Sequence, residues 1–351
     1  MRQYRPEFGS LAGETLEQAR RQVLPTLRTQ VQGLPPRQRH WAAFHFGWSD
    51  AEGNPVTGGL PGKGLRPALV YAAAQAAAGA SDRLDHATEA LSGRLDQVAA
   101  AVELVHNFCI VHDDVIDQDR ERHGRPTVWT QFGSSAALLC GDSLLALAVE
   151  CLDDIRLVGR LCEAVQELIH GEALDVEYES RRDLTTEDYL RMAELKTGAL
   201  MSAACALGAA AAGGPPELVA RMGRFGRCIG LAFQIVDDLL GIFGDPEVVG
   251  KPVGADLRRR KWTYPVLAAL SCPDPAAQSL RALYRSTEPP SDAQVAECTR
   301  AIEQAGAGDL SRAVALTALA DAEGHLESCG LDPRQTAALW ALGAMVVDRA
   351  W

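Results

Sequence analysis

The chain has 351 residues, of which 47% are hydrophobic and only 6% aromatic, and its formal net charge is −12. The acidic balance argues against the basic face that nucleic-acid binding requires, so no nucleic-acid partner is expected. Nine cysteines without a CxxC pair indicate reduced thiols, and no run reaches the ~20 apolar residues that span a bilayer. We therefore expect a cytoplasmic protein without a transmembrane segment.

Long stretches rich in alanine and leucine, without turn signals, predict helices throughout the first half of the chain. An amphipathic helix is expected over residues 11–33, and a loop rich in glycine and proline over 49–66. A helix should begin near Pro67, because proline suits a first turn, and run to about Ala78. One long helix is predicted over 86–117, and a later one carries Gly141.

Further helices are predicted over residues 155–178, 186–212 and 216–243, followed by a loop over 244–254 and helices from Tyr264 onward. No series of short β-branched runs suggests a β-sandwich. We predict one all-α domain over residues 1–351. In it, residues 1–60 pack on the outside, 61–270 carry the motifs described below, and 271–351 form C-terminal helices.

The first acidic motif, His112-Asp113-Asp114-Val115-Ile116-Asp117, ends an otherwise apolar helix. Asp113 and Asp117 are four residues apart and share a face, and the same stripe leads back to His106 and Glu103. Like charges at this spacing repel, and buried carboxylates need partners. A divalent cation with oxygen ligands, such as Mg²⁺, would remove both difficulties, although a solvated helix end remains an alternative.

A second acidic motif places Gln234, Asp237 and Asp238 on another apolar helix, where the spacing suggests that the three converge. Two such helices facing each other would set carboxylates across a cavity that binds Mg²⁺ and phosphate oxygens. Basic residues repeatedly neighbour both motifs, as a diphosphate-and-metal site requires, although each alone is more often a surface charge. They are Lys63, Arg66, Arg122, His123, Arg125, Lys196, Lys251, the run Arg258-Arg259-Arg260, and Lys261.

These motifs, in this order, resemble the trans-isoprenyl diphosphate synthase family (polyprenyl synthetases) from about residue 60 to 270. The landmarks are GKxxRP at Gly62–Pro67, the aspartates at Asp113–Asp117, an RxGxPT-like segment at Arg122–Thr127, Gly141-Asp142, Lys196-Thr197, Phe233–Asp238, Gly250–Asp256 and Lys261. The resemblance implies a bundle of long helices around a deep central cavity, usually in a homodimer. It implies condensation of isopentenyl diphosphate with an allylic diphosphate through an allylic cation.

The resemblance also implies a role for each motif residue. Asp113, Asp117 and Asp237 would hold Mg²⁺, three ions per site, with Asp114 and Asp238 supporting them. Residues that would bind the allylic diphosphate are Lys196, Lys251 and Arg122, with Lys261 close by, and Thr197 and Gln234 would lie near the reacting carbons. Residues that would bind isopentenyl diphosphate are Lys63, Arg66 and His106, with His123 at a position that usually holds a second arginine.

Two departures and two residues before the first motif bear on activity and product. The second motif of the family usually ends in aspartate where this chain has Gly241, and Arg125 is a candidate to replace the arginine missing at His123. Phe108, followed by the small Cys109, resembles synthases that stop near C20, geranylgeranyl diphosphate, with C15 or C25 as alternatives. A terpene cyclase and a non-catalytic partner subunit of a prenyl synthase remain rival hypotheses.

Overall fold

The computed structural model describes residues 6–57, 62–79, 88–244, 254–272 and 277–348. Within them the regular structure is helical except for one short hairpin, in which β1 (Glu121–Arg122) pairs antiparallel with β2 (Arg125–Pro126). The all-α prediction is confirmed. The predicted loop over 244–254 falls almost wholly outside the described residues, and so does Lys251. The grouping of the chain into one domain stays a prediction.

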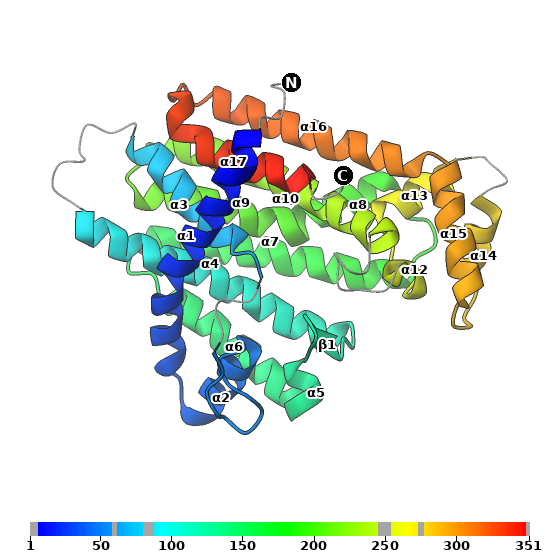
Figure 1. Cartoon of the computed structure of the whole chain (residues 1–351), viewed down its shortest axis with the longest axis horizontal. Helices are drawn as coiled ribbons and strands as arrows, with labels where there is room; N and C mark the ends of the chain where they lie inside the picture. Colours follow the sequence, from blue (N-terminus) through cyan, green and yellow to red (C-terminus); the bar gives the residue numbers. More distant parts are fainter. Residues whose placement is uncertain (1–5, 58–61, 80–87, 245–253, 273–276, 349–351) are drawn as a thin grey trace.

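The helices of the first half are α1 (Pro6–Gln32), α2 (Pro36–His45), α3 (Leu65–Ala78), α4 (Thr88–Ile116), α5 (Val128–Phe132), α6 (Ser134–Glu150), α7 (Ile155–Ser180) and α8 (Thr186–Ala193). A π-helix, η1 (Glu194–Gly198), leads into α9 (Ala199–Ala211) and α10 (Pro216–Phe243). The remaining helices are α12 (Ala255–Arg258), α13 (Tyr264–Ser271), α14 (Ala277–Arg285), α15 (Asp292–Gln304), α16 (Ala307–Glu327) and α17 (Pro333–Asp348). Figure 1 shows the long helices α4, α7, α10 and α16 running along the molecule.

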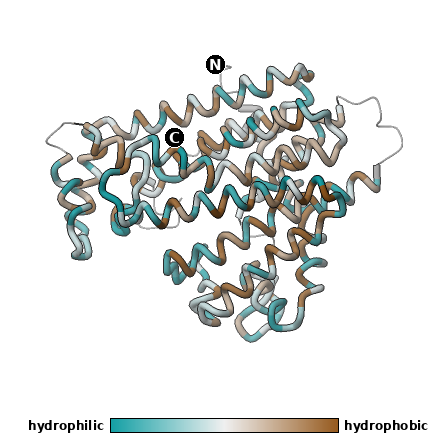
Figure 2. Tube along the Cα trace, turned by 180° about the vertical axis from the view of Figure 1, so that it is seen from behind, coloured by the Kyte–Doolittle hydropathy of each residue, from teal (hydrophilic) through white to brown (hydrophobic). Residues whose placement is uncertain are grey.

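Helix α9 lies at the centre of this arrangement and contacts α3, α4, α7 and α10. Its sequence is made of small and apolar residues, and most of them are buried. Small residues permit close approach: a Cβ at Gly208 would lie 2.9 Å from the carbonyl carbon of Val70 in α3. Figure 2 shows apolar residues concentrated on the helices inside the molecule and polar residues at its rim. The crowded centre therefore fixes the relative positions of the helices that carry the acidic motifs.

Three local features differ from the sequence predictions. Helix α2 falls in a stretch that carried no helix prediction, and its start follows from prolines at positions 35 and 36. The helix predicted over 186–212 is interrupted by the π-helix η1, and this wider turn contains Lys196 and Thr197. π-Turns inside helices often occur at functional sites. Hairpin β1–β2 folds the segment after the first acidic motif back on itself, with Gly124 at φ 69° in its turn.

The contact between α7 and η1 yields a test of this packing. A Cβ at Gly171 would overlap the backbone nitrogen of Lys196 and lie 2.7 Å from the carbonyl carbon of Leu195. We expect Gly171→Ala to lower the free energy of unfolding by roughly 1–3 kcal/mol, because backbone atoms must move apart. Thermal unfolding measures the change. Gly159→Ala is the matched control on the same helix, with nothing within 4 Å of the added Cβ, and should be neutral or slightly stabilising. Equal destabilisation by both changes would contradict this account.

Candidate active site

The two adjacent aspartates at the end of α4 face different surroundings. Burial raises the pKa of Asp113 to about 7. The nearby positive charge of Lys196 acts to lower this pKa, and the negative charge of Glu172 in α7 acts to raise it. Asp114 is buried and accepts a hydrogen bond of 2.8 Å from Nε of Arg122, and burial raises its pKa to about 6. Successive helical residues point about 100° apart, so the end of α4 separates two sites.

The first site is centred on Lys196. Its Nζ lies 2.7 Å from Glu172 and 2.6 Å from Asp175, and Nζ of Lys261 lies 3.7 Å from Asp175. Burial opposes the charge of Lys196, but Asp175, Asp113 and Glu172 outweigh it and raise its pKa. Glu172 and Asp175 were not among the predicted site residues. Their three-residue spacing on amphipathic α7, facing two predicted cations, is the signal that would have found them.

The second acidic motif divides between core and surface. Asp238 is buried and accepts hydrogen bonds from the Tyr189 hydroxyl, from Nε2 of Gln234 (3.1 Å) and from the backbone N–H of Tyr264 (3.2 Å). Burial raises the pKa of Asp238 to about 7, and the charge of Asp256 adds to this. Asp237 is exposed. The predicted convergence of the three motif residues is therefore confirmed for Gln234 and Asp238, and it stays a prediction for Asp237.

Gln234 also ties the second motif to the lysine site. The hydroxyl of Thr197 donates a hydrogen bond of 2.6 Å to Oε1 of Gln234, whose amide in turn donates to Asp238. Lys196 precedes Thr197 in the same π-helix. The predicted residues Lys196, Thr197 and Gln234 are thus brought together in the structure, next to the carboxylates of α7.

The space above Gly241 is occupied by a carboxylate from another segment. A Cβ at Gly241 would overlap an oxygen of Asp256 and lie 2.8 Å from its carboxyl carbon. Asp256 belongs to α12, which contacts α10. The acidic group absent from the last position of the second motif is therefore matched by Asp256, which reaches the same region from elsewhere in the chain.

The second site is a cavity of about 110 Å³ on the Asp114 side of α4. Its lining includes His45, Gly62, Glu103, His106, Asn107, Asp114, Arg122, His123 and Arg125. Near it, Nε of Arg66 is buried without a hydrogen-bond partner, and burial lowers the pKa of Arg66 while Glu103 acts to raise it. An unsatisfied buried guanidinium atom is costly and favours an anionic ligand. Lys63 lies on the exposed segment just before α3.

Two histidines in the wall of this cavity are held neutral. His45 forms a hydrogen bond of 2.8 Å with Oδ1 of Asn107, whose amide donates to Glu103. Burial lowers the pKa of His45 to about 4, and the nearby cations Arg122 and Arg125 act in the same direction. Burial likewise lowers the pKa of His106. His45 and Asn107 were not predicted, because their hydrogen bond joins α2 to α4, two helices that are far apart in the sequence.

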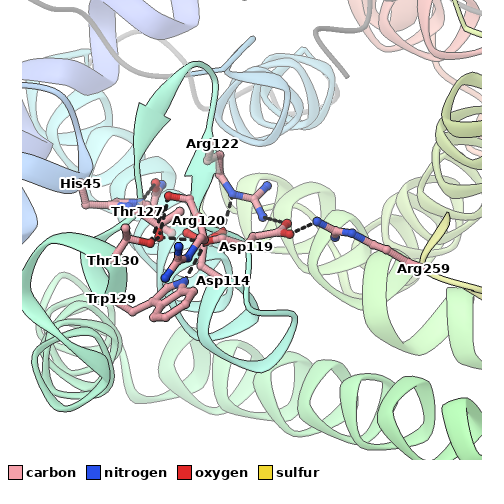
Figure 3. Close-up of polar contacts among 10 residues, drawn as sticks. His45, Asp114, Asp119, Arg120, Arg122, Thr127, Trp129, Thr130 and Arg259 are labelled. Carbon is pink, nitrogen blue, oxygen red and sulfur yellow. Dashed lines mark hydrogen bonds and ion pairs between the residues drawn. The ribbon is translucent and has the colours of Figure 1, made fainter. Parts of the chain in front are cut away.

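The basic residues of the hairpin are not equivalent. Arg122 contacts Asp114 and also Asp119, at 3.7 Å, and Asp119 pairs in addition with Arg259, which directly follows α12 (Figure 3). Arg125 donates a hydrogen bond of 3.0 Å to the Phe44 carbonyl and stacks over the Phe44 ring. Arg125 thus holds α2 against the hairpin, and its replacement of the arginine missing at His123 stays a prediction.

The two residues proposed to govern product length face different neighbours. Cys109 is half-buried near Asp113, Glu172 and Lys196, and withdrawal of its thiol from water, followed by the charge of Asp113, raises its pKa. Phe108 is buried and meets the His112 ring edge to face at 4.8 Å, and His112 fits over Gly141 of α6. Cys109 therefore lies on the lysine-site face of α4, and Phe108 on the face toward α6.

Within the described ranges, no three histidine, cysteine, aspartate or glutamate side chains form a ready metal cluster. Among the same residues, no helix combines the length and apolarity needed to cross a membrane. What the described part of the site offers is a set of carboxylates close to lysine, arginine or hydrogen-bond donors, around Lys196 on one side of α4 and around the cavity on the other.

The chain is similar in sequence to known proteins along most of its length. A family model described as polyprenyl synthetase matches residues 56–302. The (2E,6E)-farnesyl diphosphate synthase of Mycobacterium tuberculosis (strain ATCC 25618 / H37Rv) is 41% identical over 336 residues, which cover 93% of this chain and 90% of that protein. The geranylgeranyl diphosphate synthase of the same organism is 42% identical over 304 residues, covering 85% of this chain and 83% of that protein.

Among solved structures, the crystal structure of polyprenyl synthetase from Streptomyces coelicolor A3(2) matches with a TM-score of 0.86 and 36% sequence identity. The match covers 95% of this chain and 98% of that chain. The resemblance inferred from the order of the motifs is confirmed. On its sequence, its helical architecture and these matches, the chain belongs to the polyprenyl synthetase family.

Proposed function

We propose that the protein is a short-chain prenyl diphosphate synthase that joins isopentenyl diphosphate head to tail to an allylic diphosphate. The observation that carries this proposal is the division of the site by α4: Asp113 faces Lys196, and Asp114 faces Arg122 and the cavity. Two anion-binding regions side by side suit a reaction with two diphosphate substrates. A terpene cyclase acts on a single diphosphate and has no use for the second region.

The allylic diphosphate is assigned to the lysine site. Lys196 and Lys261 remain cationic, because burial disfavours their charge but nearby carboxylates, Asp175 first among them, outweigh burial and raise the pKa of Lys261 to about 12. We assign Lys251 to the same diphosphate from its motif. As the allylic carbon–oxygen bond breaks, these ammonium groups bind the pyrophosphate that leaves with the electron pair. Thr197 and Gln234 form the wall beside the allylic carbons.

The donor set fits Mg²⁺. This ion retains several waters, takes one or two carboxylates and completes its shell with phosphate oxygens, so a preformed cluster of three acids is not required. We propose Asp113, Asp117 and Asp237 as its ligands, for three ions, with Asp114, Asp238 and Asp256 as supporting acids. Bound Mg²⁺ would supply charge neutralisation for the departing pyrophosphate.

Isopentenyl diphosphate is assigned to the cavity on the other side of α4. Arg66, with its unsatisfied Nε, would bind the diphosphate together with Lys63, His106 and His123. Arg122, which also lines this cavity, keeps its assignment to the allylic diphosphate. The double bond of isopentenyl diphosphate then attacks the allylic carbon, and the new carbon–carbon bond leaves a positive charge on the isopentenyl unit. The carbon next to that charge loses a proton to the released pyrophosphate, and a new double bond forms. Because His45 and His106 are neutral, they line the cavity as hydrogen-bonding groups rather than as charges.

For the product we propose C20, with C15 and C25 as the alternatives, since relatives named geranylgeranyl, farnesyl and geranylfarnesyl diphosphate synthase all match this chain. We also propose a homodimer, because the large apolar side chains of Leu138 and Leu139 on α6 and Ile169 and Val176 on α7 are exposed. Incubating the protein with labelled isopentenyl diphosphate and each allylic primer, with and without Mg²⁺, and measuring product length tests the proposal. No prenyl product with any primer would refute it.

Removal of a proposed metal ligand should abolish turnover and preserve folding. We expect Asp113→Ala and Asp237→Ala each to lower kcat/KM by roughly 10³-fold. Tm should not fall, because the charged form of Asp113 is disfavoured by burial and Asp237 is exposed. Steady-state kinetics and thermal unfolding provide the two measurements, with Asp153→Ala, an exposed residue before α7, as the control. Full activity in either variant would remove that residue from the ligand set.

Product length should respond to both residues before the first motif. Phe108→Ala is expected to lengthen the product, because it deletes a buried ring. Cys109→Phe should shorten the product, since it adds bulk on the face that carries Asp113. Chromatography of the labelled products gives the distribution of chain lengths. If both variants make the wild-type product, neither residue limits the chain.

The buried His45 predicts a stability change in mild acid. Its pKa of about 4 in the folded protein lies below its ordinary 6.5, so the unfolded chain takes up the proton first. The stability due to neutral His45 is complete above pH 6.5 and is lost as the pH falls toward 4, by at most about 3 kcal/mol. We expect His45→Gln to flatten the fall of Tm between pH 6.5 and 4. A wild-type and variant fall of equal steepness would contradict this assignment.

A further inference from the structure

Helix α2 reaches the cavity on the Asp114 side of α4 with its last residue. The helix packs against α1, α5 and α6, and His45 at its end lines the cavity. The His45 ring meets the Phe46 ring edge to face at 5.4 Å, and Phe46 stacks on Trp48 at 4.5 Å. A segment that carries none of the acidic or basic motifs therefore places an imidazole in the cavity wall, where its neighbours hold it.

The amide of Asn107 determines which atom of His45 carries the proton. Nδ2 of Asn107 donates to the Glu103 carbonyl at 2.8 Å and to Oε1 of Glu103 at 3.2 Å. Oδ1 of Asn107 is therefore the atom that faces His45, and an amide oxygen can only accept. It follows that Nε2 of His45, 2.8 Å away, carries a proton and donates it to this hydrogen bond.

Glu103 is a buried acid of α4, three residues before His106, and only 4% of it is exposed. Burial raises the pKa of Glu103, whereas Arg66 of α3, the hydrogen bond from Asn107 and Arg20 of α1 act to lower it, Arg66 most strongly. A carboxylate so far withdrawn from water keeps its charge only beside such partners. The hydrogen bond from Asn107 thus holds the carboxylate where it acts on the charge of Arg66.

The guanidinium of Arg66 is incompletely satisfied by its surroundings. Its Nε is buried without a hydrogen-bond partner among the described residues, and Glu103 acts on its charge more strongly than Cys109 does. Because a guanidinium is planar and rigid, a carboxylate on one side of it fixes the direction in which its other N–H groups point. The charge of Glu103 itself repels an anion in the cavity, so a benefit to diphosphate binding must come from this orientation.

We propose that His45, Asn107 and Glu103 are positioning residues of the isopentenyl diphosphate site: their series of hydrogen bonds begins on α2 and ends at the carboxylate that orients Arg66 toward the diphosphate. This inference rests on the proposed function, because it deepens the assignment of the cavity. Arg66 contacts the diphosphate, and the other three residues act through it. The segment before residue 60 thereby takes part in substrate binding as well as in packing.

Glu103→Gln separates orientation from charge. If Glu103 acted only through its charge, the variant would lower KM for isopentenyl diphosphate, because a repulsive charge would leave the cavity. We expect the opposite: KM for isopentenyl diphosphate rises roughly five- to tenfold, while KM for the allylic primer and kcat stay within about twofold. Steady-state kinetics with each substrate varied in turn gives these constants, and thermal unfolding shows that the variant is folded.

Two changes at His45 separate its hydrogen bond from the space that it fills. His45→Gln retains an N–H near the position of Nε2, so KM for isopentenyl diphosphate should stay within about twofold of the wild type. His45→Phe fills the same space without a donor and should raise this KM roughly three- to fivefold. Added to Glu103→Gln, the His45→Phe change should have little further effect, because both act through one series. Assays at about pH 8 keep His45 neutral throughout.

Tyr71→Phe is the matched control. The Tyr71 hydroxyl of α3 donates to Asp96 of α4 at 2.8 Å, so the change removes a hydrogen bond between the same two helices that carry Arg66 and Glu103. It should leave KM for isopentenyl diphosphate at the wild-type value, even where Tm falls. The proposal is overturned if Glu103→Gln leaves this KM unchanged or lowers it, or if His45→Gln and His45→Phe give equal values. A rise of KM in Tyr71→Phe equal to that in Glu103→Gln also overturns it, since that pattern marks a general packing defect.

Binding measured directly separates this inference from the proposed function. Titration calorimetry of isopentenyl diphosphate into each variant, without primer or Mg²⁺, reports the effect on the cavity alone. Wild-type protein that binds isopentenyl diphosphate and forms no prenyl product would refute the proposed function and leave the effect of Glu103 and His45 on affinity measurable. Equal affinities of the wild type, Glu103→Gln and His45→Phe would refute the inference even in an active synthase, and absence of binding to the wild type would refute both.

Discussion

The site depends on one physical constraint: carboxylates that are withdrawn from water need partners for their negative charge. Asp113, Asp114 and Asp238 all have pKa values raised by burial. Their negative charge is sustained only by nearby cations or hydrogen-bond donors. The structure supplies such a partner to each acid. Lys196 lies near Asp113, Arg122 donates a hydrogen bond to Asp114, and the Tyr189 hydroxyl donates one to Asp238. The same cations are the groups proposed to bind diphosphate, so the carboxylates already hold the substrate-binding residues in position in the free protein.

Helix geometry then divides the chemistry. Each acidic motif contains two adjacent aspartates, and in each the two side chains meet different surroundings. On α4 this separates the lysine site from the arginine cavity, and on α10 it separates a structural acid, Asp238, from an exposed one, Asp237. A single turn of helix thus serves two purposes, because its neighbouring residues diverge by about 100°. The crowded centre around α9 keeps the two helices in register.

The sequence predicted the helical fold and the family, because helical periodicity and local motifs are encoded in short segments. It also named candidate site residues, among which the structure brings Lys196, Thr197 and Gln234 together. It missed Glu172, Asp175, Asp119 and Asn107 as partners of those residues. Their contacts join segments far apart in the chain, as in the pairing of Asp119 with Arg259, and no local pattern reports such meetings. It also treated Gln234, Asp237 and Asp238 as one converging group, although spacing on a helix does not say which neighbour faces the core. The π-helix at Lys196 likewise follows from tertiary packing against Gly171 rather than from local preference.

The carboxylate of Asp256 in the space above Gly241 has a wider consequence. In a motif confined to one helix, the geometry of the acids is set when that helix folds. Here the third acid comes from a separate short segment, so the local negative charge is assembled from two helices, α10 and α12. The charge beside α10 therefore depends on the contacts that hold α12 in place, such as the ion pair between Arg258 and Asp292, as well as on the hydrogen bonds within α10.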